Sequence, residues 1–363
     1  MNEKIERLTE WAEKKKAPPH TLELNVTNRC NLKCLTCWQR GTQISYKNEL
    51  TKEKWLDIIR EAGQIGVKEI RIPGSGEPLM RKDVALAIIK EVKKFGMNGL
   101  LITNGTLFDS YLIKTMIEVG WDNVTFSVDG SDPETNDYLR GVSGSFEKSI
   151  NAIKEFNTLK EKLKKSKPLL RLNVVLSKKN YNKLYQMMEL AHELGCEAVS
   201  VQPMTVFSSV GEKLKLPKQE IKELPKHIAR AKKYADKHEI YTNVDSFIKT
   251  DVVEKSNKMD ELIESEIKSI ENGFLSVPCF EPWYNLIIMP NGNVGPCSVF
   301  GGIDGVNIIN RSLEEIWYGN YLNEIRRNIL NKKLFKFCKN CCVPIFEENK
   351  RIRMELLKGA KNG

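Results

Sequence analysis

The segment TLELNVTNRCNLKCLTCW, residues 21–38, contains the pattern from which the fold of this chain can be predicted. It opens with a short apolar run at 22–26, and Cys30, Cys34 and Cys37 follow within twelve residues, with Trp38 beside the last of them. A short apolar block bounded by polar residues is typical of a buried strand in a parallel sheet. We therefore expect a strand at 22–26 that delivers a cysteine loop to one end of the sheet.

The same strand pattern recurs along the first 200 residues. Apolar runs at 67–72, 99–102, 124–128, 169–176 and 198–201 alternate with amphipathic segments of helical period. Strands joined by helices pair in parallel, because each helix returns the chain to the same end of the sheet. Six such units are fewer than the eight of a complete barrel. The sequence therefore predicts an α/β fold, a partial (β/α)6 TIM-like barrel over residues 21–211.

The pattern of apolar and polar residues changes after this barrel. Residues 212–275 are polar and predict a helical linker without a further βα unit. Two short apolar runs then flank Asn291-Gly292, a strong hairpin signal, and a helix is expected near 313–329. We expect a small α+β domain at 276–345, a helical extension at 1–20 and a basic C-terminal tail at 346–363 that contains a charged terminal helix.

Composition excludes several classes of protein. The 363 residues are 41% hydrophobic, which excludes wholesale disorder, and no apolar run approaches the roughly 20 residues of a membrane span. The N-terminus lacks the apolar core of a signal peptide, so we expect a cytoplasmic protein with reduced thiols. The nine cysteines then indicate metal or redox chemistry rather than disulfides.

The formal net charge of +10 is concentrated in two segments, residues 160–167 and 310–363. A solvated helix end and a frayed tail would explain them. The alternative is an acidic partner, such as an anionic small molecule, a peptide, a membrane surface or a nucleic acid. No basic motif is interleaved with aromatic residues, which argues against nucleic acid.

Three thiolates in one short loop can hold a metal centre. A structural zinc needs a fourth ligand, and none follows nearby, whereas an iron–sulfur cluster held by three thiolates keeps one iron open. The Cys-x3-Cys-x2-Cys-aromatic loop after the first strand resembles the signature of the radical S-adenosylmethionine (SAM) superfamily. The resemblance implies a [4Fe–4S] cluster on Cys30, Cys34 and Cys37. Its open iron would bind SAM and cleave it to a 5′-deoxyadenosyl radical that abstracts hydrogen from the substrate.

Further motifs fit the same family. Pro73-Gly74-Ser75-Gly76-Glu77-Pro78 resembles the family's Gly-Gly-Glu-Pro segment, which contacts the amino group of the cofactor, although Ser75 replaces a glycine. Arg140 resembles an arginine that holds the cofactor carboxylate. Ordinary strand-end turns are the alternative for the later residues. The resemblance implies cofactor-binding roles for Trp38, Gly74, Gly76, Glu77, Pro78, Asn104, Ser127, Asp129 and Arg140.

Three more residues are candidates on weaker grounds. Asn173 and Gln202 are polar inside the fifth and sixth strands, where they face either the cofactor or the outer surface. Asp245 is a candidate general base, with a solvated turn as the alternative.

A second group of cysteines lies near the C-terminus. The Cys-x12-Gly-x4-Cys hairpin and the later Cys-x2-Cys resemble the twitch domain, a shortened SPASM domain. The resemblance implies an auxiliary [4Fe–4S] cluster, and a zinc site with four cysteine ligands is the alternative. We prefer Cys341 to Cys342 because Cys-x2-Cys is the commoner metal-binding spacing, and we expect Cys196 to be a core residue. The predicted ligands are Cys279, Cys297, Cys338 and Cys341.

The motifs indicate the cofactor chemistry but not the substrate or the net reaction. By analogy with twitch-domain aminocyclitol dehydrogenases, the leading hypothesis is oxidation of a small sugar- or cyclitol-like alcohol, with the auxiliary cluster as electron acceptor. The alternative is a maturase that cross-links or oxidises a peptide or protein. The roughly twenty residues before the first strand leave no room for the N-terminal peptide-recognition wing that many maturases have. A non-catalytic iron–sulfur scaffold is a third reading. An electron donor such as ferredoxin or flavodoxin is an expected partner.

Overall fold

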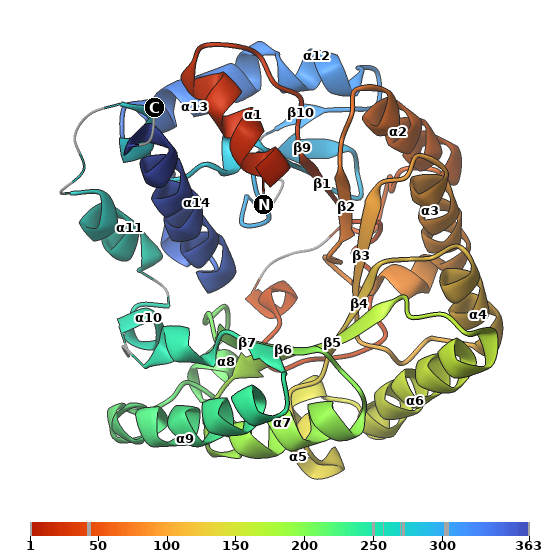
Figure 1. Ribbon diagram of the computed structural model, residues 1–363. Coiled ribbons are helices and arrows are strands. Elements are labelled where there is room, and N and C mark those ends of the chain that lie inside the picture. The colour runs from red at the N-terminus through yellow and green to blue at the C-terminus, as the bar shows by residue number, and fades with distance from the viewer. Residues whose placement is uncertain are drawn as a thin grey trace.

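The computed structural model describes residues 2–41, 45–248, 251–256, 258–268, 270, 273–300 and 305–361. One ten-stranded sheet runs through it in the order β10-β9-β8-β1-β2-β3-β4-β5-β6-β7. Its central strands form an arc, with α2, α3, α4, α6, α7 and α9 on the outer side (Figure 1). The strands are β1 (Thr21–Leu24), β2 (Glu69–Ile72), β3 (Asn98–Thr103), β4 (Asn123–Ser127), β5 (Leu169–Leu176), β6 (Ala198–Pro203), β7 (Tyr241–Thr242), β8 (Asn285–Ile288), β9 (Asn293–Gly295) and β10 (Val306–Asn307).

The predicted partial barrel is confirmed, because β1 to β6 pair in parallel and in chain order. Helices connect them on the outside of the arc, as parallel pairing requires. The helices are α1 (Asn2–Ala12), α2 (Lys52–Gln64), α3 (Lys82–Lys94), α4 (Ser110–Glu118), α5 (Pro133–Arg140), α6 (Ser145–Leu163), α7 (Leu184–Glu193), α8 (Ser209–Glu212), α9 (Lys218–Lys237), α10 (Asp251–Glu254), α11 (Met259–Ile267), α12 (Leu313–Trp317), α13 (Asn320–Leu330) and α14 (Val343–Lys361).

The sheet is longer at both ends than the sequence predicts. The expectation of no further βα unit after the sixth strand is wrong, because α9 leads into β7, which pairs in parallel with β6. With only two residues, β7 is too short to leave an apolar pattern in the sequence. At the other end, the predicted hairpin forms between β8 and β9, and β8 also pairs in parallel with β1. The hairpin therefore extends the barrel sheet.

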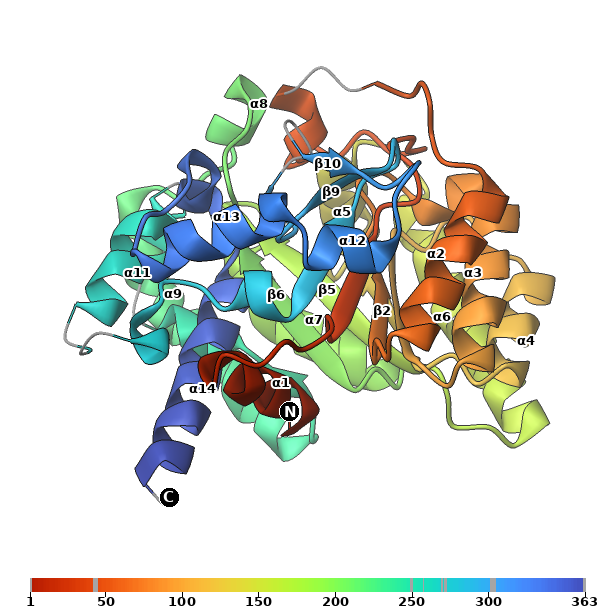
Figure 2. The same ribbon diagram turned by 90° about the horizontal axis from the view of Figure 1, so that it is seen from above.

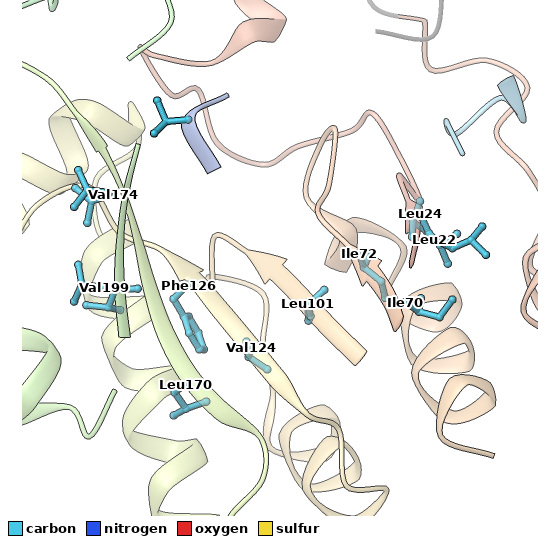
Figure 3. Close-up of a cluster of buried hydrophobic side chains, with 14 of the residues drawn as sticks. Leu22, Leu24, Ile70, Ile72, Leu101, Val124, Phe126, Leu170, Val174 and Val199 are labelled. Atoms are coloured by element: carbon cyan, nitrogen blue, oxygen red, sulfur yellow. The ribbon is translucent and has the colours of Figure 1, made fainter. Parts of the chain in front are cut away.

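The core lies between the sheet and the outer helices. Residues of β5 alternate between half-buried and buried, and the buried set, with Leu170 and Val174, packs among apolar side chains of the neighbouring strands (Figure 3). Each such side chain contributes about 1.5–3 kcal/mol on burial. Because successive residues of a strand point to opposite faces, the half-buried set faces the barrel interior.

The charged helix expected at the C-terminus is present, and it packs against the rest of the molecule. Residues 343–361 form helix α14, which lies beside α1 (Figures 1 and 2), and Lys4 pairs with Glu348 at 2.9 Å between the two helices. Arg353 is buried and donates hydrogen bonds to the carbonyls of Leu275 and Val277. The helix forms because its apolar face, with Ile352, has a surface to cover.

Several charged side chains of the two basic segments form contacts within the molecule. Lys167 pairs with buried Asp122 at 2.5 Å, and the guanidinium of Arg326 lies over the rings of Trp11 and Trp317. The helix expected at 313–329 is two helices, α12 and α13, which break at Gly319. No helix among the described residues is both long enough and apolar enough to cross a membrane.

Candidate active site and auxiliary cysteines

A cavity of about 450 Å³ lies at the carboxyl ends of the strands β1 to β4. Barrel folds place their chemistry at this end, and the volume suits a small-molecule site. Seven of the predicted cofactor-binding residues and all three cysteines of the first loop line it. They are Cys30, Cys34, Cys37, Trp38, Gly74, Gly76, Glu77, Asn104, Ser127 and Arg140.

The cysteine loop is held against the C-terminus of α5. The amide of Lys33 donates to the carbonyl of Arg140 at 3.2 Å, and the amide of Leu35 donates to the carbonyl of Leu139 at 2.8 Å. Helix α5 ends at Gly141, whose φ of +68° suits glycine. The end of this helix therefore sets where the three thiols stand.

The segment around Gly76 holds the loop from the other side. Its amide donates to the carbonyl of Thr27 at 2.9 Å, and the amide of Glu77 donates to the carbonyl of Arg29 at 2.8 Å. A Cβ atom on Gly76 would lie 2.1 Å from the carbonyl oxygen of Arg29. The sequence predicts that the absence of a side chain at Gly76 lets a ligand approach the backbone. In the structure it also lets the backbone of the cysteine loop approach.

Gln39 connects the two loops and was not predicted. Its amide nitrogen donates to the carbonyls of Asn28 and Ser75, at 2.9 Å each. The only signal for it in the sequence is its place directly after Trp38. Arg40, the next residue, donates through Nε to the carbonyl of Cys34 at 2.6 Å and also lines the cavity.

The carboxylate of Glu77 is buried and already has three donors. Oε1 accepts from the hydroxyl of Thr103 at 2.7 Å and from the amide of Leu79 at 3.1 Å, and Oε2 accepts from the amide of Asn104 at 2.7 Å. Burial raises the pKa of Glu77, and these donors oppose the rise. A carboxylate has about four acceptor sites, so one stays available for a ligand ammonium.

Arg140 lies between a carboxylate and a thiol. Its Nε is 3.0 Å from Oδ2 of Asp129, and its Nη1 is 3.8 Å from Sγ of Cys34. Asp129 is 1% exposed and also accepts from the amide of Val175 at 2.8 Å. Asp129 therefore orients the guanidinium from behind and does not itself line the cavity, whereas Arg140 has further N–H donors for a ligand carboxylate.

Four other candidates lie outside the lining of the cavity. Pro78 is buried at the start of a short turn of helix. Asn173 and Gln202 occupy half-buried positions of β5 and β6, so both face the barrel interior and not the outer surface. Asp245 is exposed in the short 3₁₀ helix Val244–Phe247, near Lys232 of α9, and is not part of the cavity lining.

The auxiliary cysteines, Cys279, Cys297, Cys338 and Cys341, share one neighbourhood. Burial raises the pKa of the Cys341 thiol far above its usual range, and the adjacent Cys342 and the three other auxiliary thiols raise it further. Burial raises the pKa of Cys342 to about 12, and its charged neighbours are the carboxylates of Glu281 and Glu23. Glu281 is also a charged neighbour of Cys279 and Cys297, so Cys342 lies close to the same group. The preference for Cys341 as the ligand therefore rests on the commoner Cys-x2-Cys spacing. Cys196 is buried in the core, as predicted.

Family comparison assigns both cysteine groups. Residues 24–191 match the sequence model of the radical SAM superfamily, and residues 279–342 match that of SPASM, an iron–sulfur cluster-binding domain. The chain belongs to the radical SAM superfamily and has a C-terminal SPASM domain. These two domains imply SAM, a [4Fe–4S] cluster and auxiliary iron–sulfur binding as the cofactor set.

Relatives of this radical SAM chain have diverse activities. It is 33% identical to the AdoMet-dependent heme synthase of Methanosarcina barkeri over 50% of each chain. It is 23% identical to a PqqA peptide cyclase of Rhizobium meliloti over 89% of this chain and 80% of the relative. The chain thus spans about half the length of the first curated relatives that it matches.

Solved structures share the fold. SuiB of Streptococcus suis bound to S-adenosylmethionine superposes with a TM-score of 0.64 at 20% identity, over 85% of this chain and 68% of that one. The enzyme anSMEcpe with bound AdoMet and a peptide superposes with a TM-score of 0.61 at 16% identity, over 95% of this chain and 100% of that one.

The donor sets match the cofactors that the family implies. The first loop brings three thiols to the cavity, and the C-terminal group supplies four more. Thiolates are the usual protein ligands of iron–sulfur clusters. Cys30, Cys34 and Cys37 could therefore hold a cluster with one open iron, and the auxiliary cysteines could hold a closed one.

Proposed function

We propose that this chain is a peptide-modifying radical SAM enzyme that oxidises or cross-links a side chain of its substrate. The observation that carries the proposal is the length of the alignment with PqqA peptide cyclase, which covers 89% of this chain and so reaches into the auxiliary domain. The match to heme synthase covers only half of the chain, about the length of the barrel that the whole superfamily shares. The comparisons lend no support to our leading sequence-based hypothesis, oxidation of a sugar-like alcohol.

The residues around the cavity have separable roles in this proposal. Cys30, Cys34 and Cys37 would each hold one iron and leave the fourth open to SAM. The free acceptor site of Glu77 suits the ammonium of SAM, and the outer donors of Arg140 suit its carboxylate. When bound, this cofactor set supplies the one-electron chemistry that removes a hydrogen atom from the substrate, and the protein supplies position.

The auxiliary cysteines have a different task. Four thiolates would close every iron of a second cluster, so that site binds no substrate through iron. We assign it the role of electron acceptor, because loss of a hydrogen atom and then a proton leaves one electron to be removed. This role makes the reaction a net oxidation of the peptide.

Cofactor cleavage tests the catalytic part of the proposal. The anaerobically reconstituted protein, given reductant and SAM, should form 5′-deoxyadenosine and methionine. The Cys30/Cys34/Cys37→Ala triple variant is the matched control: it should keep ~4 of ~8 Fe and lose all cleavage. Absence of 5′-deoxyadenosine from the wild type under every reducing condition would contradict the proposal.

A peptide encoded beside the gene tests the substrate part. Mass spectrometry should find that the peptide loses two hydrogen atoms when wild-type protein, SAM and reductant are present, and that it is unchanged with the triple variant. Cleavage of SAM that is stimulated by an aminocyclitol but by no peptide would restore the sugar-oxidation hypothesis.

A further inference from the structure

Arg171 places a guanidinium on the inner wall of the barrel. It is the third residue of β5 and belongs to the half-buried set of that strand, whereas the buried set packs in the core (Figure 3). Because the faces of a strand alternate, Arg171 projects into the barrel interior with Asn173.

This guanidinium has no partner among the described residues. Its Nε is buried without a hydrogen-bond acceptor, and no carboxylate of the described ranges forms an ion pair with it. A guanidinium has five N–H donors, and leaving them unmatched away from water is costly. The other buried or half-buried arginines of these ranges have carboxylate or carbonyl partners: Arg7, Arg71, Arg81, Arg140, Arg326 and Arg353.

Strand register places Arg171 at the level of the cavity floor. Ile102 of β3 lines the cavity and is in register with Thr125 of β4, which is in register with Arg171. Neighbouring strands are about 4.8 Å apart, so the backbone of Arg171 is roughly 10 Å from that of Ile102. Arg171 is not part of the cavity lining, and it lies two residues before Asn173, which is in register with the cavity residue Ser127.

Charge balance inside the barrel points to an anion. Arg71, the other arginine of the inner wall, is paired with Glu69 and lies 3.9 Å from Glu23. Arg171 is the inner-wall cation that no carboxylate neutralises among the described residues. A neutral ligand would leave that charge uncompensated in a partly desolvated site, whereas a carboxylate matches the planar fork with two parallel hydrogen bonds.

We propose that Arg171 binds a carboxylate of the substrate, the side chain of an aspartate or glutamate close to the residue that is modified. This inference rests on the proposed function, in which the substrate is a peptide. Arg171 thereby selects acidic peptides and sets how deep the peptide enters the barrel.

Binding of two capped tripeptides tests the proposal without turnover. Ac-Gly-Glu-Gly-NH2 and Ac-Gly-Gln-Gly-NH2 differ only in the carboxylate, and each is titrated calorimetrically into SAM-loaded, cluster-reconstituted protein without reductant. We expect the glutamate peptide to bind wild-type protein about 10-fold more tightly. Arg171→Met should abolish this preference, and Arg171→Lys should keep part of it, because a point charge without a fork stays in place.

The matched control is Arg230→Met, which removes an exposed arginine that lies over the ring of Tyr185 on the outer surface. It should keep the full preference. Iron content and melting temperature equal to wild type establish that Arg171→Met is folded. An unchanged preference in folded Arg171→Met, or no preference in wild type, overturns the inference.

The outcomes also separate this inference from the proposed function. Normal SAM cleavage without a glutamate preference overturns the role of Arg171 and leaves the catalytic proposal in place. An Arg171-dependent preference without any SAM cleavage supports the role of Arg171 and contradicts the catalytic proposal. Free glutarate is the third ligand: if it binds as tightly as the glutamate peptide, carboxylate recognition is supported and the peptide as its source is contradicted.

Discussion

Nε of Arg140 lies 3.0 Å from Oδ2 of Asp129, and the two side chains are 11% and 1% exposed. The pair connects the last residue of α5 to the loop after β4. It holds a positive charge beside Cys34, where a cluster of thiolates would otherwise collect unbalanced negative charge. Because the pair is buried, removing one partner leaves the other charged and desolvated.

We predict that Asp129→Asn destabilises the protein by about 3–5 kcal/mol, since Arg140 loses its carboxylate. Asp132→Asn is the matched control: Asp132 pairs with Lys183 at 2.9 Å but is 36% exposed, and asparagine still caps a helix. That change should cost less than about 1 kcal/mol. Urea unfolding measures both, and equal costs would show that burial of the Asp129 pair is unimportant.

Gly76→Ala should abolish binding of the first cluster. A Cβ atom at this position would lie 2.1 Å from the carbonyl oxygen of Arg29, so the loop with Cys30 must move. Iron content should fall from ~8 to ~4 per chain. Gly211→Ala is the control, because its new Cβ meets nothing closer than 3.7 Å. Full iron content in Gly76→Ala would contradict the close approach.

The two adjacent cysteines should differ in iron binding. The thiols of Cys279, Cys297 and Cys338 are charged neighbours of Cys341, and Cys338-x2-Cys341 has the commoner metal-binding spacing. We expect Cys341→Ser to lower iron content by ~4 per chain, or to leave a labile cluster, and Cys342→Ser to keep it. Iron analysis after reconstitution decides, and the reverse pattern would assign Cys342 as the ligand.

Stability should fall as acid protonates His20 in the unfolded chain. Burial, and then the nearby charge of Lys4, lower the pKa of His20 from 6.5 to about 4. The folded state therefore keeps the ring neutral while the unfolded state takes up a proton, so stability is full above pH 6.5 and is lost as the pH falls towards 4. The loss amounts to about 3 kcal/mol.

His20→Gln should remove this component of the pH dependence. Urea midpoints of wild type and variant, measured in steps from pH 7.5 to 4.5, should converge as the pH falls. Parallel curves over that range would mean that His20 is protonated equally in both states.

Local patterns predicted the barrel strands well, because each strand is a block of apolar residues whose burial does not depend on distant sequence. They missed β7, which has only two residues and pairs only because β6 is already in place. They predicted a charged helix at the C-terminus but not its packing, because the surface that covers Ile352 comes from other parts of the chain.

The cofactor chemistry can be predicted from local sequence, because the spacing of Cys30, Cys34 and Cys37 after an apolar strand is typical of a cluster loop. How that loop is held, and what surrounds it, depends on contacts between distant segments. Asp129 forms an ion pair with Arg140, and the absence of a side chain at Gly76 allows close contact with the carbonyl of Arg29. Arg171 stands unpaired on the inner wall because the register of β3, β4 and β5 puts it there. Such contacts join residues far apart in the chain, and no local spacing encodes them.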